Sequence, residues 1–537
     1  MSFNRRSFLR TGAAAAVLGV APRPLLAFLG ASPEPVPPID DPRLAALAAR
    51  ALDSAKSAGA TYADVRLTHT KRRSFLSNQT GDEETMEVGV RTLVNGFWGF
   101  ASGPVWSPDE MARLGREAVH QSKANGFGKV REVSLAPTPV VPNGNWNMPV
   151  QIDPFELSPF EVEDYLQGLK SFVGRTARAK VSLSTEFGSD IRVDCQVQDK
   201  AFASTVGTYV TQRAYRTGGV VAVTVSLDAR RAGTSGLACA TPAGMGWELF
   251  VADRIPRVRD NSLADEIVRR VDEMREELLL PIKPVQVGRY DSVFDAAGVA
   301  TLLDQTLGRA TQLDRAMGYE ANGGGTSYVS DPLHQRGAFT AGSPLVSVTG
   351  NRSESGAVAT VKWDDEGVTP DESTLVKDGV LADFQTTRES AGWLKARSHG
   401  CANAPSGIEP PLQHTPNLVM APRDGGAFNA MVGNLSDGIA IKGIQLSMDF
   451  QCASGLGFGQ VFSVKGGKRV ARLADAGFLF RATDLWKSVA TVGAESHLQR
   501  IGLDGTKGEP AQTCWHSVTA VPATVKGLTI IDVLRKA

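Results

Sequence analysis

Three side chains in TLLDQTLGRATQLDRAMGYE, residues 301–320, are of types that take part in catalysis. Asp304 and Gln305 are adjacent, and Arg309 follows five residues after Asp304. A carboxylate can bind a metal, but the neutral Gln305 amide cannot take a proton from water. Arg309 is permanently cationic and cannot coordinate zinc, so we expect it to pair with Asp304 or a neighbouring acid. The trio therefore does not support metal-assisted hydrolysis on this helix.

Two short histidine–cysteine pairs are the other candidate metal ligands. His399 and Cys401 are two residues apart, and so are Cys514 and His516. Imidazole and thiolate both bind zinc, so the two pairs brought together could form a site. The alternative, which we favour, is buried cysteines with histidines in loops. No two of the seven histidines lie three to five residues apart, so no helix presents a two-histidine clamp.

A third candidate is the acidic stretch WDDEGVTPDES, residues 363–373. Asp364, Asp365 and Glu366 are consecutive, and such a cluster could bind a cation. Its glycine and proline also fit a solvent-exposed turn, and we predict that turn. The sequence contains neither a P-loop nor a serine with glycines two residues away on both sides, so it offers no nucleotide site or hydrolase elbow of those types.

The composition is that of a globular protein with no charge bias. The 537 residues predict two or more domains, because one compact core does not grow to that size. Lys plus Arg (57) equals Asp plus Glu (57), so nothing draws the whole protein to nucleic acid or to an anionic membrane. The five cysteines are scattered without a C-x-x-C, which argues against a disulfide framework but leaves a single bridge open.

The amino terminus reads NRRSFLRTGAAAAVLGVAPRPLLA. A twin arginine followed by a short apolar run predicts a twin-arginine export signal over residues 1–31. Residues 32–42 are proline-rich and read as a linker. We therefore expect a protein that is exported already folded to a periplasmic or other extracytoplasmic location, with no membrane association beyond the signal segment.

Local signals place the elements that must position these side chains. Helical periodicity or capping patterns predict helices over 42–58, 262–280 and 296–310, and helices starting near 108 and 159. Asn95-Gly96, Asp378-Gly379 and Gly466-Gly467 predict hairpins. The pattern predicts an α+β protein of two domains, 43–285 and 286–537. The first has helices on a mainly antiparallel sheet, and the second is β-rich with one helix that carries Asp304.

The order of several segments resembles the TldD/PmbA (TldE) family of microcin-processing metallopeptidases. The resemblance is collinear from about residue 45 to residue 535, and its blocks are ALDSAKSAGATYADVRL, GVRTLVNGFWGFAS, GYEANGGGTSYVSDP, WDDEGVTPDESTLVKDGVLADFQTTRESA and ATDLWKSVATVG. In active members, the helix before the GYEA block carries His-Glu-x-x-x-His. Its histidines bind zinc, its glutamate is the general base, and a later Cys-Gly-Lys-Gly-type turn supplies a third ligand.

The resemblance places Asp304 at the first histidine, Gln305 at the general base and Arg309 at the second histidine. The later turn reads DGTKGEPAQ, with Gly505 at the cysteine position. These replacements imply a catalytically degenerate, TldE-like subunit or peptide-binding homologue, for which no zinc is predicted. The expected partners are a peptide and either a second copy or a TldD-like subunit. The alternative is an active metallopeptidase with non-standard ligands, of which His516 is the best placed.

Overall fold

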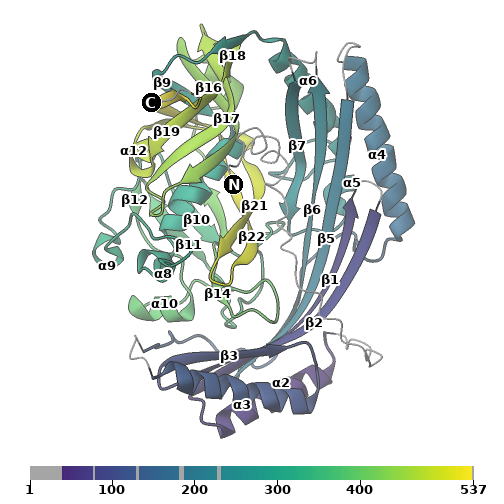
Figure 1. Ribbon diagram of the computed structural model, residues 1–537, viewed down its shortest axis with the longest axis vertical. Helices are drawn as coiled ribbons and strands as arrows, with labels where there is room; N and C mark the ends of the chain where they lie inside the picture. Colours follow the sequence, from purple (N-terminus) through teal and green to yellow (C-terminus); the bar gives the residue numbers. More distant parts are fainter. Residues whose placement is uncertain (1–38, 77–78, 128–131, 181–186, 227–231, 535–537) are drawn as a thin grey trace, which may run out of the picture.

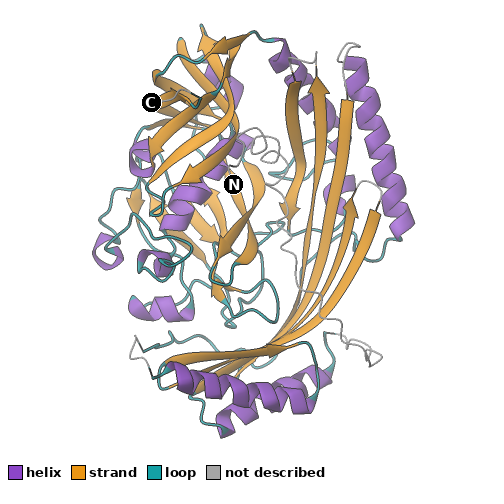
Figure 2. Cartoon of the chain, in the orientation of Figure 1, coloured by secondary structure: helices purple, strands orange, loops and turns teal. Residues whose placement is uncertain are grey.

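The computed structural model describes residues 39–76, 79–127, 132–180, 187–226 and 232–534. The predicted export signal and most of the proline-rich linker lie outside the described residues. The described chain forms two α+β parts, a long sheet with helices and a β-rich body of stacked sheets (Figure 1, Figure 2). The predicted fold class is confirmed. No helix of the described residues is both long and apolar enough to cross a membrane.

The N-terminal part is built on a seven-stranded sheet in the order β3-β2-β1-β5-β6-β4, with β7 paired to β6. All neighbours are antiparallel except β4, which runs parallel to β6. The predicted hairpin at Asn95-Gly96 joins β2 to β3. The strands are β1 (Tyr62–Leu76), β2 (Gln79–Val94), β3 (Phe97–Gly103), β4 (Gly144–Asn147), β5 (Phe187–Ser204), β6 (Tyr209–Ser226) and β7 (Ala232–Ala243).

Helices cover one face of this sheet, and their starts follow the predicted caps. Ser107 Oγ accepts from the Glu110 amide at 3.2 Å. Ser158 and Glu161 form the full reciprocal box, at 3.2 and 2.8 Å. Figure 1 shows α2 and α3 under the lower ends of the strands and α4 along their outer side. The helices are α2 (Pro42–Ser57), α3 (Pro108–Asn125), α4 (Pro159–Lys180), α5 (Glu248–Val251) and α6 (Leu263–Leu279).

The two faces of the long sheet differ in chemistry because side chains alternate along each strand. Odd-numbered β1 residues such as Val65 and Leu67 lie in the apolar core with α2 and α3. Even-numbered residues face the C-terminal part. Arg66 Nη2 donates to Glu409 O at 2.6 Å, and Lys200 of β5 pairs with Asp365 Oδ1 at 2.6 Å. This polar face is the surface that the two parts share.

The C-terminal part contains two larger sheets and a two-stranded ribbon of β13 (Ala402–Asn403) and β14 (Leu412–Gln413). One sheet has six strands in the order β12-β11-β10-β15-β22-β21, where β10 is Val348–Asn351, β11 Glu372–Lys377, β12 Val380–Leu381, β15 Asn417–Met420, β21 Gln499–Lys507 and β22 Gln512–Ala520. The other has eight strands, β8 (Ile282–Pro284), β9 (Gly288–Phe294), β16 (Asp437–Met448), β17 (Ser454–Lys465), β18 (Lys468–Ala474), β19 (Ala476–Arg481), β20 (Val489–Val492) and β23 (Ala523–Asp532). Both predicted hairpins are present, β11–β12 and β17–β18.

Short helices connect these strands. They are α7 (Ala296–Leu303), α8 (Leu313–Ala316), α9 (Pro332–Gln335), α10 (Arg388–Trp393), α11 (Phe428–Gly433), α12 (Ala482–Lys487) and the 3-10 turn η2 (Glu495–His497). The helix predicted over 296–310 differs from the structure. It is α-helical as α7, continues as a π-helical turn, η1 (Asp304–Gly308), and ends with helical residues 309–310. The π turn begins at Asp304, and such turns are frequent at functional sites.

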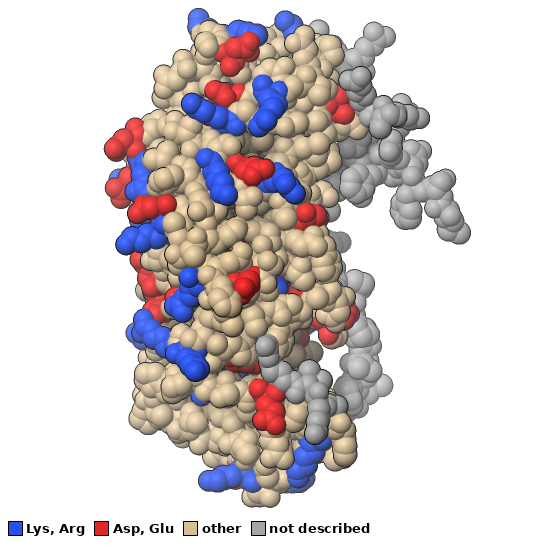
Figure 3. All heavy atoms as spheres, turned by 90° about the vertical axis from the view of Figure 1, so that its left-hand side faces the viewer, with Lys and Arg blue, Asp and Glu red and all other residues tan. Residues whose placement is uncertain are grey.

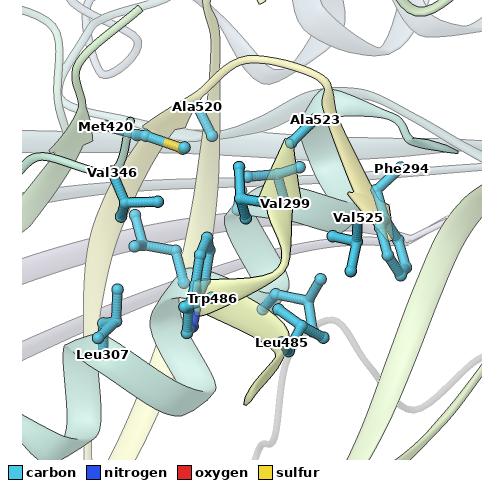
Figure 4. Packing of buried hydrophobic residues seen from close by; sticks show 14 of the residues in the cluster. Phe294, Val299, Leu307, Val346, Met420, Leu485, Trp486, Ala520, Ala523 and Val525 are labelled. Atoms are coloured by element: carbon cyan, nitrogen blue, oxygen red, sulfur yellow. The ribbon is translucent and has the colours of Figure 1, made fainter. Parts of the chain in front are cut away.

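The apolar stripe of this helix is buried as predicted. Val299, Leu302, Leu303 and Leu307 belong to the large core between the two C-terminal sheets. Figure 4 shows Leu307 and Val299 close to the indole of Trp486. Trp486 Nε1 donates to Thr306 Oγ1 at 2.8 Å, and this bond anchors the π turn to the core. The helix is therefore held rigidly while its polar side chains point away from the core.

The outer surface carries no single-sign patch on the face shown in Figure 3, where acidic and basic side chains alternate over the C-terminal part. Equal numbers of positive and negative residues spread in this way give no long-range field to attract nucleic acid. The charged side chains that bear on how the protein is held together are therefore those buried between its two parts.

Candidate functional site

The centre of the candidate site is a buried pair between the π turn and β22. His516 Nε2 donates to Asp304 Oδ1 at 2.7 Å. Asp304 is 3% exposed and His516 2%, so both are removed from bulk water. A charge-assisted bond of this length is strong in such surroundings. The two residues are 212 positions apart, and only the fold brings them together.

Gln305 completes the surroundings of the carboxylate. Its Nε2 donates to Asp304 Oδ2 at 2.7 Å, so both carboxylate oxygens have a donor. Burial would raise the pKa of Asp304, but the charge and hydrogen bond of His516, with help from Arg309 and Gln305, outweigh burial and hold it below its ordinary value. Asp304 is therefore an ionised, fully satisfied side chain.

Arg309 does not form the ion pair expected of it. Asp304 pairs with His516 instead, and Arg309 makes no ion pair with any residue that the structure describes. The reason is the π turn, which adds a residue to the helical turn and changes the direction of the side chains that follow. The charge of its guanidinium still contributes, after His516, to lowering the pKa of Asp304.

Gly505 lies next to the same imidazole. It is on β21, directly opposite Cys514 of β22. A Cβ atom at Gly505 would be 3.6 Å from His516 Cε1 and 3.8 Å from His516 Nδ1, which is ordinary contact distance. The structure therefore brings Asp304, Gly505 and His516 together, and a Cβ atom at position 505 would fit there in contact with the imidazole.

The end of β21 and the turn after it are held against residues 312–320 by polar contacts. Lys507 Nζ is 2.5 Å from Asp314 Oδ2 and donates to Gln312 Oε1 at 3.2 Å. The Gly508 amide donates to Glu320 Oε2 at 3.2 Å. Burial lowers the pKa of Lys507, against the charges of Asp314 and Glu320. These contacts hold the end of β21 and the turn after it in place, and none of them needs a metal ion.

The first histidine–cysteine pair lies elsewhere and has another role. His399 Nδ1 is 2.7 Å from Asp371 Oδ1, and its Nε2 is 3.3 Å from Asp383 Oδ2. Burial alone would lower the pKa of His399, but the hydrogen bonds and charges of the two carboxylates raise it to about 9. His399 is therefore an imidazolium that joins two loops, and both of its ring nitrogens are occupied.

The cysteines are inert groups of the interior. Cys401 and Cys514 are buried, and burial raises the pKa of each thiol to about 12. The four cysteines whose side chains the structure describes, Cys195, Cys401, Cys452 and Cys514, are free. Among the described residues, no three His, Cys, Asp or Glu side chains are grouped so that they could hold a metal ion. The two pairs are not brought together.

The prediction of a surface turn at the acidic stretch is wrong. Asp364, Asp365 and Glu366 are 2–3% exposed. Asp365 pairs with Lys200, and Glu366 Oε1 is 3.1 Å from Arg91 Nη2. The sequence suggested a turn correctly, but this turn is covered by the N-terminal sheet, whose cations neutralise it. These carboxylates already have cationic partners, so they join the two parts of the protein rather than forming an open cation site.

The residues at the centre do not fit a zinc site of the type that the resemblance implies. Zinc needs three or four ligands with free lone pairs. Asp304 has both oxygens engaged, Gly505 has no side chain, and Gln305 offers no proton acceptor. The Arg309 guanidinium stands where a second cation would be repelled. We therefore derive no step through a metal at this site.

The polar face of the N-terminal sheet was missed in the sequence. The signal was present in RVDCQVQDK, residues 192–200, where polar and apolar residues alternate. The alternation predicts a strand, and its polar side requires polar partners. In the structure Gln198 Nε2 donates to Pro405 O at 3.2 Å, and Lys200 pairs with Asp365. A strand with one fully polar face far from solvent indicates a second polar surface opposite it.

Comparison with known proteins places this site in a family. Residues 287–530 match the model of the PmbA/TldA metallopeptidase C-terminal domain. A metalloprotease of Methanocaldococcus jannaschii is 22% identical over 458 residues, covering 83% of this chain and 93% of that protein. A metalloprotease of Methanothermobacter thermautotrophicus is 24% identical over 461 residues, covering 83% and 91%.

The fold agrees with a solved structure. TldE from Thermococcus kodakarensis superposes with a TM-score of 0.67 over 91% of this chain and 99% of that one, at 13% sequence identity. The likeness at that identity concerns the fold, and it extends over both parts of the protein. The match over 287–530, with the two relatives that each cover 83% of this chain, places the chain in the TldD/PmbA family.

Proposed function

We propose that this protein is a catalytically degenerate, TldE-like member of its family that binds peptides and does not itself hydrolyse them with zinc. One observation carries the proposal: Asp304 and His516 satisfy each other at 2.7 Å at the point where the resemblance places the first zinc ligand. A hydrogen-bonded Asp–His pair joins the helix to β22 directly. No metal is needed to hold that geometry.

The neighbouring replacements support the same conclusion. Gln305 stands at the position of the general base, and its amide nitrogen is used to hold Asp304. A neutral amide has no basic lone pair with which to take a proton from water. Arg309 adds a permanent positive charge whose influence lowers the pKa of the carboxyl. Asp304 and Arg309 therefore stand at the positions of two histidine ligands, and Gln305 stands at the position of the general base. The positive charge of Arg309 also disfavours a bound metal ion.

The family of the chain supports a partner, and its amino-terminal sequence supports a location outside the cytoplasm. TldE-like fold and family membership support assembly with a TldD-like subunit or with a second copy around the peptide site. The twin-arginine pattern in residues 1–31 supports export of the folded protein, alone or already assembled, to the periplasm or beyond the membrane. The role would be in peptide processing, as a binding or supporting subunit.

Metal analysis of the full chain, purified without chelator, tests this proposal. We expect less than stoichiometric zinc and no peptidase activity from the isolated chain. We also expect co-purification with a chain that carries an intact His-Glu-x-x-x-His, or a homodimer. Stoichiometric zinc with chelator-sensitive peptide cleavage that is lost in Asp304→Ala would overturn the proposal and favour an active enzyme with non-standard ligands.

A further inference from the structure

A pocket of about 480 Å³ lies where the N-terminal sheet meets the loops of the C-terminal part. β3 forms one wall, the turn between β21 and β22 a second, and residues within 319–324 and 408–412 the others. Ser102 Oγ of β3 donates to Ile408 O at 3.2 Å, so the two parts of the protein are in contact here. The volume is in the range of pockets that bind ligands. We call it the Glu509 pocket, after the exposed acid on the turn.

The Glu509 pocket lies at the turn end of the hairpin that carries part of the candidate site. β21 bears Gly505, and β22 bears His516. Gln512 lines the pocket and precedes His516 by four residues along β22. A strand rises about 3.3 Å per residue, so these two residues are about 13 Å apart along it. Figure 1 shows the lower end of β22 above β3, and a peptide extended along this hairpin would span the distance with about four residues.

The charged side chains that line the pocket are all acidic, among the residues that the structure describes. They are Glu320, Glu409 and Glu509, whereas the whole chain has equal numbers of acidic and basic residues. Glu320 Oε2 accepts from the Gly508 amide at 3.2 Å, and Glu409 Oε2 accepts from Ser406 Oγ at 2.6 Å. Neutral donors such as these orient a carboxylate without cancelling its charge. The pocket therefore presents negative charge to a ligand.

Two glycines bring two of these carboxylates to one segment of the wall. A Cβ atom at Gly324 would be 2.5 Å from Glu320 Oε2, and one at Gly323 would be 3.9 Å from Glu509 Oε2. Glu320 and Glu509 therefore both lie against the Gly323-Gly324 backbone. A side chain at position 324 would push the Glu320 carboxylate away, so glycine at this position allows the carboxylate to approach the backbone closely.

Three cations lie behind the walls of the pocket, and acids of the interior offset them. Lys507 is 3% exposed, and its Nζ is 2.5 Å from Asp314 Oδ2. Arg315 is 2% exposed and lies beside Glu320, because its Nη2 would be 3.3 Å from the same Cβ position at residue 324. Arg66 donates to a backbone carbonyl of the wall at 2.6 Å, and two buried carboxylates act on its charge. The remaining two carboxylates of the pocket are therefore in excess.

The rest of the pocket wall includes aromatic and aliphatic side chains. Phe100 of β3 lies on one side, and Tyr319 and Ile408, which are 44% and 40% exposed, lie on the other walls. The Tyr319 ring stacks on Trp393 with 4.7 Å between the ring centroids, which holds it in place. Aromatic faces attract cations, and the stems of Lys and Arg pack on apolar surface while their charged ends reach polar groups. Acids beside aromatic rings therefore suit a cationic ligand.

We propose that the Glu509 pocket binds a cationic group of the peptide, with the Glu509 and Glu409 carboxylates as its acceptors. This inference rests on the proposed peptide-binding function and adds the charge of the ligand to it. The group is the amino terminus of the peptide or the side chain of a lysine or arginine. A basic side chain would pack its aliphatic part on Ile408 and the aromatic rings, and its nitrogen would donate to the carboxylates.

Three forms of one peptide distinguish the sources. The probe is Ala-Val-Ser-Gly-Thr-Val-Ala with a neutral fluorescent label at the carboxyl terminus, as the acetylated peptide, with a free amino terminus, and acetylated with Lys in place of Gly. Fluorescence anisotropy at pH 7 and about 0.15 M salt, which screens long-range attraction, measures binding to the full chain and to the double variant Glu409→Gln, Glu509→Gln. Glu276→Gln is the matched control, because Glu276 is an exposed residue of α6, which Figure 1 shows at the opposite end of the molecule from β3.

We expect the wild-type protein to bind at least one cationic form about tenfold more tightly than the neutral form, the gain typical of one charge-assisted contact. The form that gains identifies the source of the cation. The double variant should lose that preference and bind the neutral form as the wild type does, and Glu276→Gln should keep the preference. Glu509→Asp, which retains the charge, should keep most of it, and this variant guards against a loss caused by a misfolded turn.

The two proposals fail in different ways. If the wild-type protein binds all three peptides with equal affinity, this inference is wrong while peptide binding stands. If no form binds, both the peptide-binding function and this inference are overturned. A preference for the cationic forms that persists in the double variant would assign it to other acids. A preference that Glu276→Gln also removes would be a general effect of charge, and either result would overturn the role of this pocket.

Discussion

His516 Nε2 and Asp304 Oδ1 are 2.7 Å apart, and their bond joins a π-helical turn to a central strand of the six-stranded sheet. Both side chains are nearly inaccessible to water. The bond spans 212 residues of sequence, so it closes a long loop of the C-terminal part. The resemblance places the first zinc ligand of active family members at Asp304. The bond to His516 therefore both closes this loop and satisfies the side chain at that position.

Asp304→Asn should destabilise the protein at pH 7 by about 3–5 kcal/mol, because it removes the charge of a buried pair and leaves one oxygen to accept from two donors, His516 and Gln305. Urea unfolding followed by circular dichroism measures the loss. Asp437→Asn is the control. Its partner Lys465 and Asp437 are each 58% exposed, and we expect a change below about 1 kcal/mol. Equal losses in the two variants would contradict the assigned role of the buried pair.

The same pair gives a pH dependence of defined sign. The pKa of Asp304 is lowered in the folded protein, so its stabilisation is present above the unfolded pKa of about 3.9 and is lost as pH falls through the folded value. The difference between wild type and Asp304→Asn should therefore be constant near neutral pH and shrink below about pH 4. A difference that grows on acidification would show that the carboxylate is not ionised in the folded state.

Restoring the family ligands should create a zinc site. The change is Asp304→His, Gln305→Glu, Arg309→His and Gly505→Cys together. Gly505 has room for a side chain, since the nearest atom to its Cβ position is 3.6 Å away. We expect stoichiometric zinc after dialysis, measured by atomic absorption, and little in the triple variant that keeps Arg309. Absence of zinc in a folded quadruple variant would show that these positions do not correspond to the family ligands.

His399→Gln should show the opposite pH behaviour. The pKa of His399 is raised to about 9, so its stabilisation is complete below the unfolded pKa of about 6.5 and disappears as pH rises through about 9. A pKa of about 9 instead of about 6.5 corresponds to about 3 kcal/mol, given a side chain that is largely buried. Urea midpoints at pH 6 and pH 10 measure it. We expect the gap to wild type to be large at pH 6 and small at pH 10.

Lys200→Met tests the joint between the two parts. It leaves Asp365 buried without its cation and should cost about 3–5 kcal/mol. Lys465→Met removes an exposed partner of Asp437 by the same substitution and should cost less than about 1 kcal/mol. Unfolding of the variant should also begin with separation of the two parts, visible as early proteolysis between them. A neutral effect of Lys200→Met would mean that the acidic turn is solvated.

Features that depend on neighbours in sequence were predictable. The Asn95-Gly96 and Asp378-Gly379 hairpins form because their turn residues tolerate the required positive φ angles. The caps at Ser107 and Ser158 form because their oxygens reach amides three residues ahead. The buried stripe of α7 follows from helical spacing alone. The π turn inside the helix was not predictable from neighbours in sequence, and its Thr306 accepts a hydrogen bond from Trp486, 180 residues away.

The sequence by itself determined the class of fold and the family. It also determined which atoms the helix offers, because residue type decides which side chains can bind a metal or take a proton. The tertiary structure decided which partner each polar side chain has. It paired Asp304 with His516 rather than with Arg309, and it buried the acidic turn against Lys200 and Arg91. Those pairings join residues more than 160 positions apart, and local patterns carry no information about such distances.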